Sequence, residues 1–156
     1  MSSPTTPYNY SYAAIPGAFV LGLVPHSYYL TRLMIATKNA QSNAMPRTNL
    51  ETWKGKLPHA LWNHLARARG AHLNSMEVFP LFAAAMVAGN VTKMPVEDLN
   101  SVAWSFFTSR ALYMALYLGV KSDMLAPART GAYVWSISIP VMALWRAGKV
   151  AADTGL

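Results

Sequence analysis

Polar side chains that could do chemistry gather in the stretch RARGAHLNSMEVFP, residues 67–80, directly before the apolar run LFAAAMVAG. At about 100° per residue of an α-helix, four of its residues share one face: Arg67, Gly70, Asn74 and Glu77. Arg69 and His72 point nearly the opposite way. The stretch therefore predicts that the polar residues on the two sides of the helix have separate roles.

A second one-sided stripe lies further along the chain, where Arg110, Tyr113 and Tyr117 follow the i, i+3, i+7 spacing of one helix face. Helices that carry such stripes are expected to face each other. An ionised side chain at membrane depth costs about 2.5 to 3.5 kcal/mol, so Glu77 and Arg110 need partners there. They could pair with each other or hold a zwitterionic ligand in a cavity, or the polar residues could simply join helices through hydrogen bonds.

Composition indicates the elements that position these residues. Of 156 residues, 53% are hydrophobic and only 12% are charged, about half the usual charged fraction of roughly 25%. This composition is typical of a membrane protein, and the length favours one domain, residues 1–156. The chain has no cysteine, so any thiol must come from a bound small molecule.

The hydropathy pattern predicts an all-α integral membrane protein with four spans, at about residues 13–37, 60–90, 99–118 and 130–147. Residues 38–57 are polar and are expected to form a surface loop. The net charge of +7 is scattered between apolar runs without a nucleic-acid motif, so no nucleic-acid partner is expected. His59 and His64 lack a zinc-ligand pattern, so no metal site is predicted.

Basic residues predict the orientation of the spans. The four spans divide the connections between two sides of the membrane. The far side, with the second connection and both termini, holds only Lys93, Arg146 and Lys149. The side of the first and third connections holds Lys38, Arg47, Lys54, Lys56, Arg67, Arg69, Lys121 and Arg129. This richer side is expected to be cytoplasmic, with both termini on the far side.

Two motifs carry a family resemblance. RARGAHLNSMEVFPLFAAA resembles the second-helix signature of the membrane-associated proteins in eicosanoid and glutathione metabolism (MAPEG), with its Arg, Ala-His, Asn and Glu followed by aromatic-Pro. SRALYMALYL is similar to the third-helix pattern of the family, and the FAAA run looks closest to its bacterial and fungal branch. The resemblance implies a four-helix transmembrane bundle, a homotrimer, and a glutathione site between subunits near the cytoplasmic face.

The resemblance also implies roles for single residues. Asn74 and Glu77 would bind glutathione, with Glu77 taking its ammonium group, and His72 would lie near the peptide. The third-helix aromatics Tyr113 and Tyr117 would line the tripeptide. The bracing arginines match Arg67 and Arg110, and the basic position at the end of the first helix matches Lys38 or Arg32. The catalytic candidates are Tyr117, His72 and Arg129.

Two departures from the family pattern weaken the match to its thiolate chemistry. Family synthases usually have arginine at the position of Gly70, where neighbouring Arg69 is the nearest replacement. Counting back from the LAP sequence puts the thiol-activating arginine at Met124. Methionine cannot stabilise a thiolate, so Arg129 and Lys121 are the nearest basic side chains that could take over.

Three functional hypotheses follow, and the resemblance favours an enzyme. The first is a glutathione transferase, peroxidase or isomerase acting on a lipophilic substrate that enters from the bilayer lipids. The second is a thiol-independent isomerase or cyclase with His72 or Glu77 as the acid–base group. The third is a non-catalytic lipid-presenting scaffold, which the Met124 departure favours. In a eukaryote, the family resemblance implies the endoplasmic reticulum or another microsomal membrane.

Overall fold

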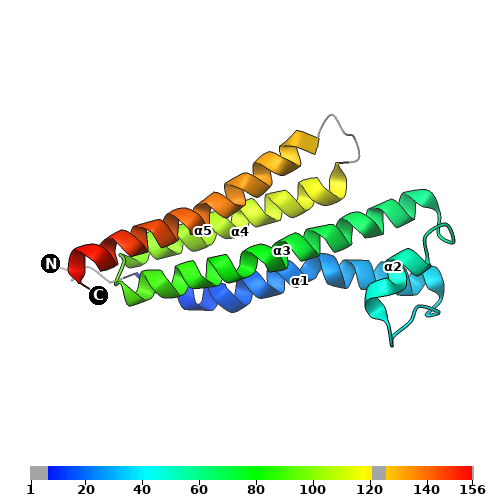
Figure 1. Cartoon of the computed structure of the whole chain (residues 1–156), viewed down its shortest axis with the longest axis horizontal. Helices are drawn as coiled ribbons and strands as arrows, with labels where there is room; N and C mark the ends of the chain where they lie inside the picture. The colour runs from blue at the N-terminus through cyan, green and yellow to red at the C-terminus, as the bar shows by residue number, and fades with distance from the viewer. Residues whose placement is uncertain (1–6, 121–125, 156) are drawn as a thin grey trace.

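The fold consists of four long helices that run lengthwise beside one another (Figure 1). The computed structural model describes residues 7–120 and 126–155, and within these ranges it contains helices and no strand. The long helices are α1 (Ser11–Thr37), α3 (His59–Val91), α4 (Val96–Gly119) and α5 (Ala126–Thr154). Each predicted span lies inside one of them, and the all-α class is confirmed.

The connection between α1 and α3 was predicted to be a loop, and that prediction is wrong for part of it. It contains the short helices η1 (Pro46–Thr48) and α2 (Asn49–Thr52). The buried side chain of Asn49 folds the segment back, because it accepts from the Ser42 N–H and donates to the Ser42 carbonyl, each at 2.8 Å. The Trp62 indole of α3 then donates to the Leu50 carbonyl at 2.8 Å. The connection is therefore anchored against the start of α3.

Local sequence explains where the helices begin. Both α3 and α4 start directly after a proline, Pro58 and Pro95, whose fixed φ suits a helix start. Glu97 and Asp98 occupy the first turn of α4, where carboxylates favour the helix dipole. Prolines also lie inside α1, α3 and α5, as neighbouring helices in membrane proteins permit.

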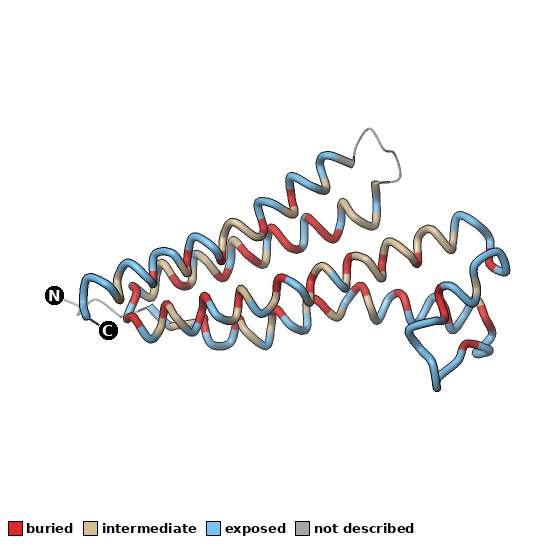
Figure 2. The backbone as a smooth tube through the Cα atoms, in the orientation of Figure 1, coloured by how far each residue is buried: buried red, intermediate tan, exposed pale blue. Residues whose placement is uncertain are grey.

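Helix α3 lies at the centre of the packing, since it contacts α1, α4 and α5. The stacked rings of Phe82 and Phe106, with centroids 4.0 Å apart, join α3 to α4 in the main apolar core. Buried residues lie on the sides of the helices that face one another, and exposed residues lie outside (Figure 2). The buried faces therefore hold the helices together through ordinary side-chain packing.

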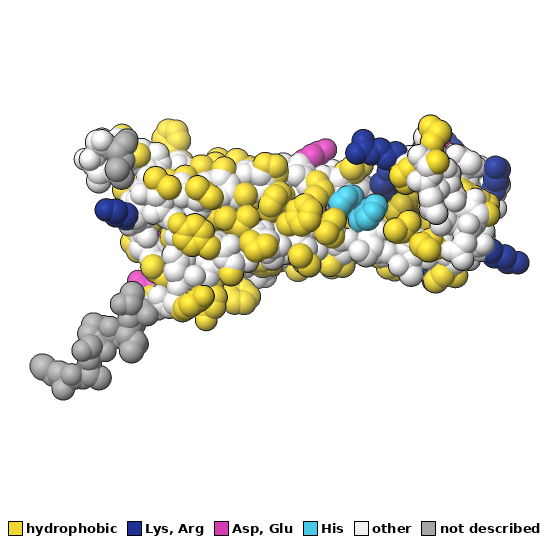
Figure 3. Space-filling view, turned by 90° about the horizontal axis from the view of Figure 1, so that it is seen from below, with side chains coloured by type: hydrophobic (Ala, Val, Ile, Leu, Met, Phe, Trp, Pro, Cys, Tyr) yellow, Lys and Arg dark blue, Asp and Glu magenta, His cyan; other side chains and the backbone are white. Residues whose placement is uncertain are grey.

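The outer surface is unusually apolar, as Figure 3 shows for one face. Large hydrophobic side chains such as Trp104, at 66% exposed, and Met142, at 63%, point away from the core. Two helices, α1 and α3, are long and apolar enough to cross a membrane. An exposed apolar surface of this kind suits contact with lipid or with another subunit.

The two ends of the molecule differ. Both termini lie at one end, where all four long helices are close together (Figure 1). Toward the other end, the α4–α5 pair leans away from the α1–α3 pair. At the end that holds the termini, Tyr8 and Asn9 are fixed by polar contacts, because the Asn9 amide donates to Asn90 and the Asn100 amide donates to the Tyr8 carbonyl, each at 2.8 Å.

Candidate functional site

The two predicted polar stripes meet at the contact between α3 and α4. Asn74 of α3 donates a hydrogen bond of 2.5 Å from its amide to the hydroxyl of Tyr113 on α4. The ring of Tyr113 is only 1% exposed and lies 5.3 Å from the ring of Tyr117, one turn later. Tyr133 of α5 adds a third ring, 5.6 Å from that of Tyr113. The two helices therefore face each other as predicted at Asn74 and Tyr113.

A polar cavity of about 200 Å³ opens among these side chains, between the last turns of α4 and the first turns of α5. Helices α3, α4 and α5 all contribute to its lining: Asn74, Tyr113, Tyr117, Arg129, Thr130 and Tyr133. The guanidinium of Arg129 lies over the Tyr117 ring, 5.2 Å from its centroid. The cavity thus combines one cation, one amide and three phenols.

Sequence reasoning missed Thr130 and Tyr133. Helical periodicity contains the signal, because Tyr133 follows Arg129 by four residues and so shares its helix face. Choosing that face required knowing that Arg129 points toward α4, which only packing decides.

Arg110 lies on α4, one turn before the cavity residue Tyr113, and joins three helices. Its side chain is almost fully buried, at 2% exposed. It donates to the hydroxyl of Ser75 on α3 at 2.8 Å and to that of Ser136 on α5 at 3.1 Å. The guanidinium also lies 4.4 Å from the centroid of the Tyr113 ring. The Arg110 guanidinium therefore packs against the Tyr113 ring and restrains its position.

Gly70 permits the close approach of Tyr117 to α3. A Cβ atom built on Gly70 would lie 2.8 Å from the Tyr117 hydroxyl and 3.2 Å from the edge of its ring. Any other residue here would have to displace that ring. The departure from arginine at Gly70 thus leaves space that the Tyr117 side chain uses.

His72 lies on the other side of α3, away from the cavity, as its spacing predicted. Its Nδ1 lies 2.9 Å from the carbonyl oxygen of Gly22 on α1. Because a carbonyl only accepts, Nδ1 must carry the proton in this contact. The ring of His26 lies 4.7 Å away. Among residues 7–120 and 126–155, the structure does not bring His72 together with the candidate residues that line the cavity.

Glu77 and Arg67 are also outside the cavity. Glu77 is exposed and makes no hydrogen bond or ion pair with any residue in 7–120 or 126–155. The mutual ion pair considered for Glu77 and Arg110 does not form, since Arg110 donates to serines instead. Arg67 contacts His64 of its own helix, with 3.2 Å between the terminal nitrogen and Nδ1. Met124 and Lys121 lie outside the described residues.

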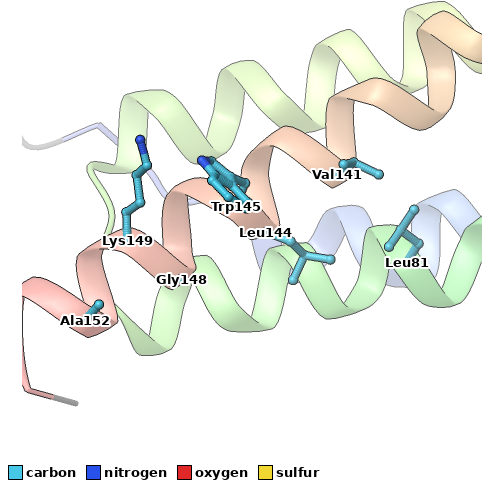
Figure 4. Close-up of a pocket in the computed structure, with 7 residues that line it drawn as sticks. All are labelled: Leu81, Val141, Leu144, Trp145, Gly148, Lys149 and Ala152. Atoms are coloured by element: carbon cyan, nitrogen blue, oxygen red, sulfur yellow. The ribbon is translucent and has the colours of Figure 1, made fainter.

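A separate apolar cavity of about 570 Å³ lies between α3 and α5 near the termini (Figure 4). Leu81 of α3 and Leu144 of α5 are among its lining residues, and Lys149 lies beside the Trp145 ring, 5.8 Å from its centroid. Lys149 is the one titratable side chain in this lining. The lining therefore lacks the combination of polar groups found around Arg129.

Comparison with known proteins gives one match. The family model described as MAPEG family matches residues 12–149, which includes all four long helices nearly to their ends. No curated protein and no solved structure matches the chain.

Proposed function

Because the chain belongs to the MAPEG family, we propose that it is a membrane enzyme that uses glutathione against a lipophilic small molecule. Members of this family are membrane-associated and of the glutathione-related transferase and isomerase type. The proposal depends on one observation, the cavity in which Asn74, Tyr117 and Arg129 meet.

The cavity offers the groups that a tripeptide thiol needs. The Asn74 amide and the phenols of Tyr113 and Tyr117 can exchange hydrogen bonds with peptide and carboxylate oxygens. The Arg129 guanidinium can pair with an anion, either a carboxylate or the thiolate itself. These groups come from three helices, so their relative positions are fixed by packing rather than by one flexible loop.

The size of the cavity supports a site shared between subunits. About 200 Å³ lies below the roughly 300 Å³ at which ligand pockets begin. Glu77, one turn beyond Asn74, is exposed and without a polar partner among the described residues. In the proposed homotrimer, a neighbouring protomer closes the open side, and the glutathione ammonium group pairs with Glu77. The His72 face of that neighbour completes the enclosure.

Arg129 is the proposed thiol-activating residue in place of Met124. A free thiol has a pKa of about 8.5 and is only a few per cent ionised at neutral pH. A guanidinium near the sulfur stabilises the thiolate and raises that fraction. Arg129 is the cation in the cavity lining, and the Tyr117 hydroxyl beside it would donate to the sulfur or the departing group.

The second substrate would arrive through the bilayer. Val134 and Trp135 follow the cavity residue Tyr133 on α5 and are exposed, at 60% and 45%. An apolar outer surface next to a polar cavity suits a lipophilic electrophile that diffuses laterally in the membrane. The thiolate would attack the electrophilic carbon of this substrate, and the bond from that carbon to the leaving group would break. The leaving group would depart with the bonding electron pair and take a proton from the Tyr117 hydroxyl or from water.

Glutathione binding and turnover test the proposal together. We expect the purified protein to bind glutathione in calorimetry and to conjugate chlorodinitrobenzene. The Asn74→Ala variant should bind at least about tenfold more weakly, because a hydrogen bond to a charged ligand group contributes about 1.5 to 3 kcal/mol. Asn43→Ala, a change at an exposed position in the loop, is the matched control and should bind normally.

Two results would contradict the proposal. One is a wild-type protein that does not bind glutathione, and the other is an Asn74→Ala variant that binds it as well as the control. Turnover of a lipophilic substrate without added thiol would support the thiol-independent isomerase instead.

A further inference from the structure

A second polar cavity, of about 620 Å³, lies between α1 and the start of α3. It does not include any residue of the proposed glutathione cavity. Six of its lining residues are polar: Tyr28, Arg32, His59, Asn63, His64 and Arg67. It lies toward the end opposite the termini, where most of the Lys and Arg side chains visible in Figure 3 gather. We call it the α1–α3 groove.

The charge of the α1–α3 groove is unbalanced. Two guanidinium groups, of Arg32 and Arg67, line it, and no Asp or Glu does. The Arg67 Nε atom is buried and has no hydrogen-bond partner, and Arg32 makes no hydrogen bond or ion pair within residues 7–120 and 126–155. Arg67 uses one terminal nitrogen to donate to Nδ1 of His64. Unused guanidinium donors without a carboxylate favour an anionic ligand.

Phosphate is the anion whose geometry fits two arginines best. Guanidinium groups bind phosphate oxygens through paired hydrogen bonds, and phosphate offers several acceptor oxygens at once. The Tyr28 hydroxyl and the Asn63 amide supply further neutral donors in the same lining. The cavity volume is also within the usual range of roughly 300 to 1,000 Å³ for ligand sites.

The surface beside the groove indicates that the phosphate belongs to a lipid. Val24 and Val20 precede Tyr28 at steps of four residues on the same face of α1, and they are 55% and 61% exposed. An apolar stripe therefore runs from the groove toward the middle of the helix. Basic groups at the membrane surface beside apolar side chains are the arrangement that binds anionic lipid headgroups.

We infer that the α1–α3 groove binds the phosphate headgroup of an anionic membrane lipid between Arg32 and Arg67, with an acyl chain along Val24 and Val20. This inference does not depend on glutathione binding.

The test measures binding of phosphatidic acid and phosphatidylcholine, each dispersed in neutral detergent, to the fluorescently labelled full-length protein by thermophoresis. We expect phosphatidic acid to bind more tightly than phosphatidylcholine. Arg32→Gln should weaken phosphatidic acid binding by about fivefold, the amount for one basic side chain at a lipid surface. Arg32→Lys keeps the charge and should retain most of the affinity, which separates loss of binding from misfolding.

Arg47→Gln is the matched control, since Arg47 is exposed in η1 and does not line the groove. Equal losses in Arg32→Gln and Arg47→Gln would overturn the inference, because general surface charge would then explain the binding. Equal affinity for the two lipids would overturn it as well. Inorganic phosphate forms a separate arm, and Arg32-dependent binding of phosphate without any preference for phosphatidic acid would overturn the assignment to a lipid.

Discussion

At the scale of single residues, the pairing of Arg129 with Tyr117 decides what chemistry the proposed site can do. The guanidinium lies 5.2 Å from the centroid of the Tyr117 ring and at the edge of a cavity that also holds Asn74. The cation and the proton donor are therefore neighbours before any ligand arrives. A thiol bound between them would meet both at once.

Replacing Arg129 tests the thiolate proposal directly. Without the cation, the pKa of the bound glutathione thiol should rise by about one unit or more, which is about 1.4 kcal/mol of lost thiolate stabilisation. The pH–rate profile of Arg129→Gln should therefore shift to higher pH, and its rate at neutral pH should fall at least about tenfold. Arg129→Lys should show a smaller shift. An unchanged profile in Arg129→Gln would assign thiol activation to another group.

Gly70→Ala tests how closely Tyr117 must approach α3. The new methyl group would lie 2.8 Å from the Tyr117 hydroxyl, so the phenol must move. Because this atom is at the end of a side chain, stability should change by less than about 1 kcal/mol, with the helix gain of alanine offsetting the shift. Conjugation activity should fall about tenfold, since a misplaced catalytic group is costly.

Gly131→Ala is the control for that variant, because a Cβ atom on Gly131 meets nothing within 4 Å. It should be as active as the wild type and slightly more stable in thermal unfolding. Full activity in Gly70→Ala would show that the Tyr117 position does not matter for turnover.

Part of the site could be predicted from residue spacing alone. The i, i+3, i+7 stripe of Arg110, Tyr113 and Tyr117 turned toward Asn74 as expected. Thr130 and Tyr133 were missed because periodicity places Tyr133 on the Arg129 face of α5 but does not say that this face packs toward α4. In the proposed homotrimer, the positions of Glu77 and His72 relative to the cavity would depend on contacts between protomers, which no periodicity within one chain describes.

At the scale of helices, Arg110 connects α3, α4 and α5 through two serines and one aromatic ring. Burying an ionised arginine costs about 2.5 to 3.5 kcal/mol on insertion scales. Its two hydrogen bonds contribute roughly 0.6 to 1.7 kcal/mol each, and its cation–π contact about 1 to 2 kcal/mol. Cost and gain nearly cancel, so stability alone gives no reason for an arginine at this position.

This balance predicts the outcome of Arg110→Met. The free energy of unfolding should change by less than about 1 kcal/mol, because methionine fills similar space without the buried charge. The affinity for glutathione should fall several-fold, because the Tyr113 ring loses the group that braces it. Thermal unfolding in detergent and calorimetry separate the two effects. A loss of several kcal/mol of stability would show instead that Arg110 serves mainly to hold the helices together.

The long helices could be predicted because their apolar runs are long, and because Pro58, Pro95 and the polar connections mark where helices begin or end. The short helices η1 and α2 could not, since four residues carry too little periodicity. Their formation depends on the Asn49 side chain bonding back to Ser42, a contact seven residues apart.

At the scale of the whole molecule, the arrangement predicts a fixed orientation in the membrane. Both termini lie at one end, and the basic connection between α1 and α3 lies at the other (Figure 1). Basic connections stay on the cytoplasmic side. The connection should therefore face the cytoplasm, and both termini the opposite compartment.

Thiol labelling can check this orientation, because the chain contains no cysteine. Asn43→Cys in the connection and Asp153→Cys near the end of α5 each introduce one exposed thiol. In sealed vesicles with the cytoplasmic side outward, a membrane-impermeant maleimide should label the first and spare the second until detergent is added. Equal labelling of both before detergent would contradict the proposed topology.

The asparagine contacts at the terminal end have a practical consequence for protein production. Residues 8–11 are held against the last turn of α3 and the first turns of α4, through Asn9 to Asn90 and through Asn100 to the Tyr8 carbonyl and the Tyr10 N–H. Trimming the chain to the start of α1 would remove these hydrogen bonds and destabilise the end where all four helices converge. Affinity tags and protease sites should therefore be placed ahead of Tyr8, so that a recombinant protein keeps these hydrogen bonds.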